Sequence, residues 1–306
     1  MPREDSGSAL TKTRWDGGGG ASWPPPALDE ATEALIALAL REDLGPAGDV
    51  TSAAVLPAAA GCAGRIVARE PIVLAGLEVA RAVFARVDPA VRFQSHLIDG
   101  TRVAAGLSLA EVTGPARALL AAERTALNFL QRLSGVATLT ARYVERIAGT
   151  RCVLLDTRKT TPGLRAQEKA AVRAGGGRNH RWGLFDAILI KDNHVAIAGG
   201  LRAAVEAARA HAGHLLGIEV EVDTLEQLRE ALALGVEVVL CDNMPPGKLA
   251  EAAALRDRLR PATRLEASGG VTLENVAEIA KSGVDYVSVG ALTHAARAVD
   301  IGLDLD

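Results

Sequence analysis

Apolar and polar stretches alternate regularly beyond residue 150. Six short apolar runs are each followed by a stretch whose apolar residues recur at helical spacing. A buried parallel strand reads as such a run, and the helical stretch supplies the crossover to the next strand. The pattern predicts parallel βα units, with strands at 152–155, 187–190, 217–220, 237–240, 264–267 and 285–289. An incomplete barrel, or one with an irregular seventh unit, fits this number as well as a full eight-stranded barrel.

The chain before residue 150 mixes both periodicities. Residues 28–40 have apolar residues at helical spacing, and Gly45 and Pro46 end this helix. Another helix and four strand-like runs follow, and together they indicate a small α+β domain. The helix is 77–87, and the runs are 65–70, 71–76, 91–97 and 108–114.

Two further helices are expected between residues 116 and 149, separated near Ser134 and Gly135. We place the boundary between the domains there, so the predicted N-terminal domain is 28–135 and the C-terminal domain is 136–306. Residues 1–27 contain four consecutive glycines and three consecutive prolines. This composition cannot bury enough surface to fold, so it predicts a flexible tail.

The overall composition is that of a folded protein. Of the 306 residues, 49% are hydrophobic and 23% are charged, which excludes a wholly disordered chain. A net charge of −3 and an aromatic content of 3% argue against nucleic acid as a partner. No apolar run reaches the roughly 18 residues of a membrane span, and the N-terminus has no apolar signal core. We therefore expect no membrane partner and a cytoplasmic location.

The three cysteines fit the same compartment. Cys62, Cys152 and Cys241 lie far apart, in or beside apolar stretches. An odd number of separated cysteines is typical of buried free thiols in a reducing environment. A nucleophile or a metal ligand is the less favoured alternative.

Charged residues and glycines directly follow the six apolar runs. Because the C-terminal ends of parallel strands converge on one face, where the active sites of barrels lie, we expect these residues to be neighbours in space. In chain order they are Asp156 to Lys159, Lys191 to His194, Glu221, Asp242 with Asn243, Ser268 to Gly270, and Gly290.

The segment 158–191 is strongly basic. It holds eight Lys or Arg residues against two acidic ones, a charge of +6 in a chain whose net charge is −3. A loop of this charge suits a small polyanion. The alternative is a solvated basic face, because Arg165, Lys169 and Arg173 recur at helical spacing. The basic residues that directly follow apolar runs fit this alternative less well.

Two carboxylates and two glycine loops complete the candidate chemistry. Glu221 and Asp242 end predicted strands, so they can hold Mg²⁺ or accept hydrogen bonds from ribose hydroxyls. The alternative is that both pair with nearby cations. The loops at 268–270 and 289–291 each open a predicted helix, where backbone N–H groups can bind a phosphate. Taken singly, each loop could equally be an ordinary turn.

These residues lie in segments that resemble the quinolinate phosphoribosyltransferases, also called carboxylating nicotinate-nucleotide pyrophosphorylases. The resemblance spans about residues 28–300 in one order, and the conjunction of DTRKTTPG, GGGRNHR and IKDNH is highly specific. The other matching segments include REDLGPAGDVTS, AERTALNFLQRLSGVAT, EVEVDTLEQL, LCDNM, LEASGGV and VDYVSVGALTH.

The resemblance implies an α/β protein with an N-terminal α/β sandwich domain and a C-terminal open α/β barrel of parallel strands. It leaves open that the last residues return to the N-terminal domain. It also implies a homodimer in which the N-terminal domain of one chain caps the barrel of the other. The implied reaction converts quinolinate and phosphoribosyl pyrophosphate into nicotinate mononucleotide, pyrophosphate and carbon dioxide. This is a step of de novo NAD biosynthesis, and Mg²⁺ accompanies the phosphoribosyl donor.

The resemblance also divides the candidate residues between the two substrates. Those expected around the quinolinate carboxylates are Arg158, His180, Arg181 and Lys191. Those expected to hold the phosphoribosyl donor are Lys159, Glu221, Asp242, Ser268, Gly269, Gly270, Val289, Gly290 and Ala291. We add Thr157 and His294 to the substrate-binding set. The residues assigned catalytic roles are Lys159, Lys191, Glu221 and Asp242, and Mg²⁺ is assigned to Glu221 and Asp242, directly or through water.

Arg124 enters only through the resemblance, which implies that the partner subunit donates it to the site. On spacing alone, an Arg in a helix is a surface or pairing residue.

Two other functions remain alternatives. A related enzyme for a different acidic ring would be expected to lose part of the quinolinate set, whereas all four of those residues are present. A non-catalytic anion-binding module would keep the basic segment without Glu221 and Asp242, and both acids are present.

Overall fold

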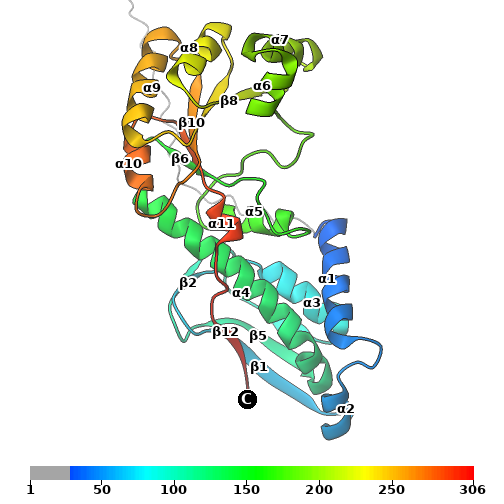
Figure 1. Ribbon diagram of the computed structural model, residues 1–306. Helices are drawn as coiled ribbons and strands as arrows, with labels where there is room; N and C mark the ends of the chain where they lie inside the picture. Colours follow the sequence, from blue (N-terminus) through cyan, green and yellow to red (C-terminus); the bar gives the residue numbers. More distant parts are fainter. Residues whose placement is uncertain (1–27) are drawn as a thin grey trace, which may run out of the picture.

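The computed structural model describes residues 28–306, so the tail predicted for residues 1–27 lies outside the described residues. The molecule is elongated (Figure 1). An antiparallel sheet lies at one end, a parallel sheet with its helices lies at the other, and the long helix α4 (Ala116–Arg146) lies between them.

The N-terminal sheet contains four antiparallel strands in the order β12-β1-β5-β3. These are β1 (Gly61–Ala68), β3 (Arg92–Gln94), β5 (Ser108–Pro115) and β12 (Ile301–Leu305). A small antiparallel pair is formed by β2 (Ile72–Val73) and β4 (Arg102–Val103). The C-terminal strand β12 pairs with β1 from Gly64 to Ala68, so the end of the chain lies in the N-terminal sheet.

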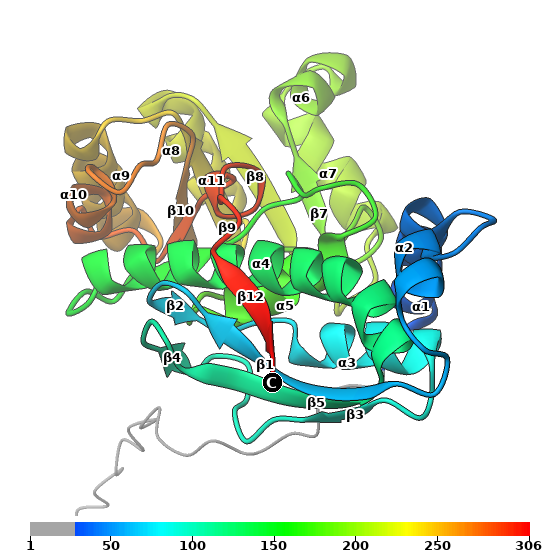
Figure 2. The same ribbon diagram turned by 90° about the horizontal axis from the view of Figure 1, so that it is seen from below.

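Helices cover one side of this sheet, as the view from below shows (Figure 2). They are α1 (Glu30–Leu44), α2 (Val50–Val55), α3 (Leu77–Val87) and α4. Asp29 caps α1 by accepting a hydrogen bond from the Thr32 N–H at 2.8 Å. Fully buried apolar residues such as Ile36, Phe84 and Leu130 join these helices to the sheet in one core.

The predicted break near Ser134 and Gly135 is wrong, because α4 runs through both residues without interruption. Both positions instead serve close packing. The Ser134 hydroxyl accepts a hydrogen bond from the Ala75 N–H at 3.0 Å and donates one to the Ala75 carbonyl at 3.2 Å. A Cβ at position 135 would collide with the carbonyl oxygen of Arg297. Gly135 therefore lets a distant segment approach the helix, at a modest cost in helix propensity.

The C-terminal sheet contains six parallel strands in the order β6-β11-β10-β9-β8-β7. They are β6 (Val153–Leu155), β7 (Ile188–Ile190), β8 (Ile218–Val222), β9 (Val238–Asp242), β10 (Arg264–Ser268) and β11 (Tyr286–Ser288). All six predicted strands are confirmed. Within residues 28–306 the edge strands β6 and β7 do not pair with each other, so the barrel is open. A single parallel bridge from Leu155 to Arg178 adds an irregular segment beside β6.

Helices follow the strands of this sheet (Figure 1). They are α5 (Arg165–Ala174), α6 (Asp192–Ala198), α7 (Leu201–His211), α8 (Leu225–Leu234), α9 (Pro246–Leu259), α10 (Val276–Lys281) and α11 (Ala291–His294). None of the helices between residues 28 and 306 is both long and apolar enough to cross a membrane.

Candidate active site

A cavity of about 600 Å³ opens where the strands of the parallel sheet end. The predicted residues that line it are Thr157, Arg158, Lys159, His180, Arg181, Lys191, Glu221, Asp242, Ser268, Gly269 and Gly270. They come together because parallel strands all end on the same edge of the sheet. Asn243, which was expected beside Asp242, lines the cavity too, and so do residues that sequence reasoning missed, among them Glu266 and Ser288.

Two arginines lie in the cavity without an acidic partner. Within the described residues, Arg158 makes no side-chain hydrogen bond or ion pair, and its Nε is buried and unpartnered. Among the same residues, the Arg181 guanidinium donates one hydrogen bond, to the carbonyl oxygen of Ala187 at 3.1 Å. Burial lowers the pKa of Arg181, and the nearby charge of Arg158 lowers it further. The cavity thus holds unneutralised positive charge, which favours an anionic ligand.

His180 contacts two glutamates that sequence reasoning missed. Its Nε2 lies 3.1 Å from Glu219 Oε2 and 3.6 Å from Glu266 Oε1. Its Nδ1 accepts a hydrogen bond from the Arg181 N–H at 2.7 Å, so the ring proton lies on Nε2. Burial alone would lower the pKa of His180, but the hydrogen bond to Glu219 and the charges of both glutamates raise it.

Glu266 is the most buried acid of the cavity, and its side chain is 2% exposed. Burial and the adjacent charge of Glu219 raise the pKa of Glu266 to about 8. The strand pattern offers a signal for both acids: Glu219 precedes Glu221 by two residues in β8, and Glu266 precedes Ser268 by two in β10. Residues two apart in a strand face the same side of the sheet. Each glutamate could therefore have been predicted to face the same side as its neighbour that lines the cavity.

Lys191 and Glu221 form an ion pair across the cavity. Lys191 lies between β7 and α6, and its N–H donates to His194 Nδ1 at 2.9 Å. The alternative that the strand-end acids pair with nearby cations therefore describes Glu221 in this structure. Asp242 differs, because its carboxylate accepts a hydrogen bond from the Asn243 side chain at 2.6 Å.

The ends of β9 and β10 are shaped by one tight contact. Asp242 pairs with Ser268 in the sheet, and the Asn243 N–H donates to the Ser268 carbonyl at 2.8 Å. Asn243 and Gly269 both have positive φ angles, 51° and 86°. A side chain at position 269 would collide with Asn243 Oδ1, so this turn requires glycine. The exposed backbone of Gly269 and Gly270 consequently faces the cavity.

The predicted loop Val289–Ala291 and His294 are not among the residues that line the cavity, but they lie close to Lys159, which is. The Thr293 hydroxyl donates to the Lys159 carbonyl at 2.7 Å. A Cβ at Gly290 would lie 3.0 Å from the Lys159 side chain and 3.2 Å from His294 Nε2. This loop therefore packs against Lys159.

Arg124 is the other predicted residue that does not line the cavity. It is exposed on α4, in the part of the helix that covers the N-terminal sheet. Within one chain, the structure does not bring it to the other candidate residues.

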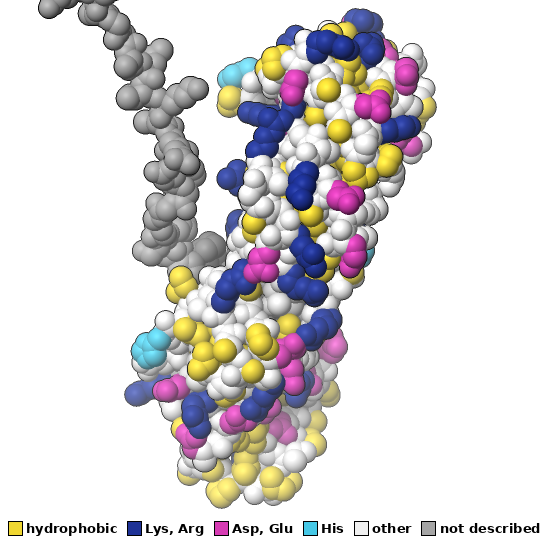
Figure 3. Space-filling view, turned by 90° about the vertical axis from the view of Figure 1, so that its left-hand side faces the viewer, with side chains coloured by type: hydrophobic (Ala, Val, Ile, Leu, Met, Phe, Trp, Pro, Cys, Tyr) yellow, Lys and Arg dark blue, Asp and Glu magenta, His cyan; other side chains and the backbone are white. Residues whose placement is uncertain are grey.

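The basic segment is neither wholly a site nor wholly a solvated face. Lys169 is fully buried, so the prediction of a solvated face is wrong for this member. Arg173 is exposed and donates to the Asn179 side chain at 2.5 Å. Lys and Arg side chains also follow one another down one face of the molecule (Figure 3). Surface position and net charge alone therefore do not mark the cavity.

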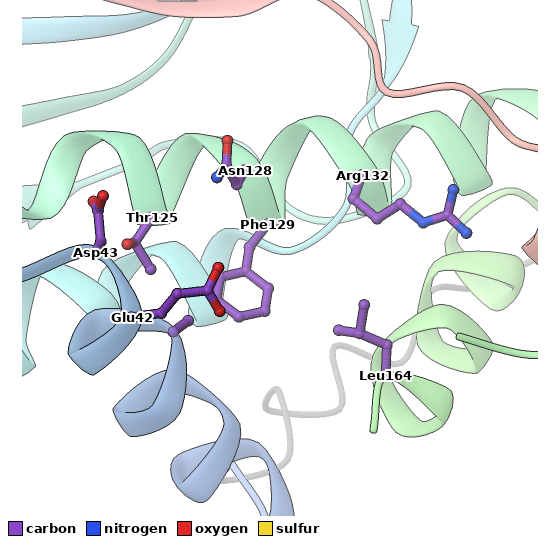
Figure 4. Close-up of a pocket in the computed structure, with 8 residues that line it drawn as sticks. Glu42, Asp43, Thr125, Asn128, Phe129, Arg132 and Leu164 are labelled. Carbon is purple, nitrogen blue, oxygen red and sulfur yellow. The ribbon is translucent and has the colours of Figure 1, made fainter. Parts of the chain in front are cut away.

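A second cavity of about 310 Å³ lies between α1, α4 and the start of α5 (Figure 4). Glu42 and Asp43 reach it from α1, and Arg132 reaches it from α4. The Arg132 guanidinium already pairs with the buried Glu168 at 2.7 Å. The free charge of this cavity is therefore acidic, which makes it unsuited to the polyanionic ligand that the first cavity favours.

Comparison with known proteins agrees with this geometry. Residues 49–134 match the family described as quinolinate phosphoribosyl transferase, N-terminal domain, and residues 136–304 match the C-terminal domain of the same family. The nicotinate-nucleotide pyrophosphorylase [carboxylating] of Mycobacterium leprae is 48% identical over 278 residues, which are 90% of this chain and 98% of that protein. A probable nicotinate-nucleotide pyrophosphorylase [carboxylating] of Bacillus subtilis is 46% identical over 86% of this chain and 90% of its own length.

Solved structures show the same architecture. NadC from Streptococcus pyogenes superposes with a TM-score of 0.87 and 40% identity, covering 92% of this chain and 99% of that one. The nicotinate-nucleotide pyrophosphorylase of Francisella tularensis has a TM-score of 0.86 and 37% identity, covering 92% and 98%. The two family domains follow each other along the described chain and together contain strands of all three of its sheets. This chain belongs to the quinolinate phosphoribosyltransferase family.

Proposed function

We propose that this chain transfers the phosphoribosyl group of phosphoribosyl pyrophosphate to quinolinate and decarboxylates the product to nicotinate mononucleotide. The observation that carries the proposal is the cavity of about 600 Å³, which gathers five cationic or imidazole side chains with two strand-end acids. Quinolinate carries two adjacent carboxylates and the donor carries phosphate and pyrophosphate. A site for both must therefore neutralise several negative charges, and Arg forks suit carboxylates and phosphates well.

In the first step the quinolinate ring nitrogen attacks the anomeric carbon of the ribose. The bond from that carbon to pyrophosphate breaks, and its electron pair leaves with pyrophosphate. Lys159 neutralises the leaving group, while Glu221 and Asp242 accept hydrogen bonds from the ribose hydroxyls and counter the positive charge at the anomeric carbon. Backbone N–H groups at Gly269 and Gly270 hold a phosphate of the donor.

In the second step the carboxylate beside the ring nitrogen leaves as carbon dioxide. The electron pair of the broken bond stays on the ring carbon, where the adjacent quaternised nitrogen stabilises it, and a proton then replaces the lost group. This step needs little acid or base assistance from the protein. Arg158, His180 and Arg181, together with Lys191, serve mainly to orient the two carboxylates.

Lys191 must exchange partners for this chemistry. In the structure it pairs with Glu221, the acid assigned to the ribose. A quinolinate carboxylate offers Lys191 a second anionic partner in the same cavity. Binding of quinolinate would then release Glu221 for the phosphoribosyl donor. Each substrate would therefore favour binding of the other.

The carboxylates of Glu221 and Asp242 are suitable ligands for Mg²⁺. Both acids line the cavity at the ends of the neighbouring strands β8 and β9, and carboxylate oxygens are ligands that Mg²⁺ prefers. The ion also retains waters and binds substrate phosphates, so two protein carboxylates suffice. Bound there, Mg²⁺ would supply positive charge that shields the pyrophosphate from the acids.

We also propose a homodimer in which Arg124 of each chain serves the cavity of the other. Its exposure on α4, away from the cavity of its own chain, supports this arrangement. A cytoplasmic location is part of the proposal. The cysteines are free, and burial raises the pKa of Cys152 and of Cys241 to about 12, which keeps both thiols inert.

The direct test incubates the purified protein with quinolinate, phosphoribosyl pyrophosphate and Mg²⁺ and measures released carbon dioxide and released pyrophosphate. Pyrophosphate is needed because turnover of nicotinic acid, which lacks the second carboxylate, would release no carbon dioxide. Nicotinic acid replaces quinolinate in one control, and a chelator removes Mg²⁺ in another. We expect release only with quinolinate and the metal. Turnover of nicotinic acid without turnover of quinolinate would overturn the proposal.

A further inference from the structure

A buried ion pair lies behind the quinolinate side of the cavity and belongs to no substrate-contacting set. Asp156 follows β6, Lys169 lies in α5, and both side chains are 0% exposed. Lys169 Nζ lies 2.5 Å from Asp156 Oδ1. Burial raises the pKa of Asp156 and lowers that of Lys169, while the contact between them opposes both shifts. Neither residue lines the cavity.

The pair holds the main chain of His180 from both sides. Asp156 Oδ1 accepts a hydrogen bond from the His180 N–H at 2.8 Å. Lys169 Nζ donates to the His180 carbonyl at 3.1 Å. The second carboxylate oxygen of Asp156 accepts from the Asn179 side chain at 2.6 Å, and this side chain also donates to the Lys169 carbonyl at 2.9 Å.

The main chain that carries His180 has few other ties to the parallel sheet. It reaches β6 through the single bridge between Leu155 and Arg178 and then continues as loop until β7. Its glycine-rich start is buried and closely packed at Gly175 and Gly177, but beyond His180 the loop carries exposed residues such as Phe185. The imidazole also contacts Glu219, and this contact requires the main chain of His180 to lie where the buried pair holds it.

We propose that Asp156 and Lys169 are positioning residues that place His180 and Arg181 for the carboxylates of the pyridine substrate. The inference rests on the proposed function, because it assigns a purpose to the way His180 is held. It goes further because it states that the affinity for quinolinate depends on two residues that do not line the cavity. A pair that serves stability alone would support both substrates equally, whereas a positioning pair should affect quinolinate selectively.

The test compares two double variants in which the same two positions are replaced. Asp156→Asn with Lys169→Gln removes both charges but keeps an oxygen for the His180 N–H and a donor for its carbonyl. Asp156→Leu with Lys169→Met fills similar volumes without either hydrogen bond. We expect the apolar variant to raise the KM for quinolinate roughly 10- to 100-fold, with the KM for phosphoribosyl pyrophosphate changed less than about threefold. The amide variant should keep both KM values within about threefold.

A second buried ion pair, between α9 and the residue before β11, provides the control. Arg256 and Asp285 are 2.6 Å apart with 2% and 8% exposed side chains, and they contact no cavity residue named above. Replacing them by Met and Leu also removes the partners of the buried Leu265 N–H and Thr263 carbonyl, so it should lower the melting temperature without a selective rise in the KM for quinolinate. Circular dichroism checks the folding of every variant.

Each outcome bears on one claim. A folded apolar variant with an unchanged KM for quinolinate, or with equal rises in both KM values, would overturn the positioning role. If the apolar variant does not fold, Asp156→Asn with Lys169→Met replaces it and the same criterion applies. Compared with the amide variant, this variant lacks only the donor to the His180 carbonyl. Wild-type protein that fails to use quinolinate would instead refute the proposed function.

Discussion

Replacing Arg158 by Met should separate binding from stability. Among the described residues the Arg158 side chain has no acidic partner, its Nε is buried and unpartnered, and its charge lies near Arg181. The folded protein therefore carries a cost at this position that only a bound anion offsets. Met keeps the apolar stem of the side chain and removes the charge and the unpartnered donor.

The magnitudes follow from the contacts that Arg158 has and lacks. A buried donor without a partner costs about 1 to 3 kcal/mol, so its removal should leave the melting temperature at or slightly above the wild-type value. One charge-assisted hydrogen bond to a substrate carboxylate contributes about 1.5 to 3 kcal/mol. Its loss corresponds to a decrease of roughly 10- to 150-fold in kcat/KM for quinolinate.

Thermal melting with and without quinolinate, combined with steady-state kinetics, checks both halves of this prediction. The matched control is Arg178→Met, which removes an exposed Arg of the same basic segment that does not line the cavity. We expect the control to behave like wild type, and the Arg158 variant to lose the rise in melting temperature caused by quinolinate. A variant that melts several degrees lower and keeps its kcat/KM would show that Arg158 is a structural residue.

Two further predictions concern pH and subunit exchange. Because burial and Glu219 raise the pKa of Glu266 to about 8, the folded chain holds a proton that the unfolded chain releases, and the free energy of unfolding should fall as pH rises from about 5 to 8. Glu266→Gln should flatten this dependence in denaturant titrations at several pH values; an equal slope in both proteins would argue against the shifted pKa. For the dimer, Arg124→Ala and Lys159→Ala should each be nearly inactive alone, but mixed and reassociated subunits should regain about a quarter of wild-type activity, because half of the dimers are mixed and each has one intact site. Mixed subunits that stay inactive after exchange would place Arg124 outside the partner's site.

The strands and the gathering of site residues could be predicted from the sequence because both follow from backbone geometry. Short apolar runs separated by helical patterns require parallel strands, and parallel strands end on one edge. Residues as far apart as Thr157 and Gly270 therefore line one cavity without any knowledge of their contacts. The same argument did not predict Glu266, because this residue lies within β10 and not after it, although it lines the cavity.

Local sequence gave less information where a residue serves a distant contact. Ser134 and Gly135 are typical of a helix break, but here they admit Ala75 and Arg297 to the surface of α4. The helix continues through both residues because the packing of its long apolar face outweighs the lower helix propensity of one glycine. These contacts join segments that are 59 residues apart at Ala75 and more than 150 apart at Arg297, so they leave no mark in the local pattern.

The count of charges along the sequence identified the basic segment, but it could not show which of its Lys and Arg residues line the cavity. Lys169 adds to the +6 that predicts a polyanion site, although its charge is neutralised by Asp156 in the interior and never faces the cavity. Arg158 counts the same in the sum and meets no acid at all among residues 28–306. The difference between them depends on which side of the 178–181 loop each one reaches. Lys169, buried beneath the loop, is paired with Asp156 and holds the main chain of the loop. Arg158, which lines the cavity, remains available to a ligand. The position of each cation in the fold therefore assigns its role, which the sum of charges cannot do.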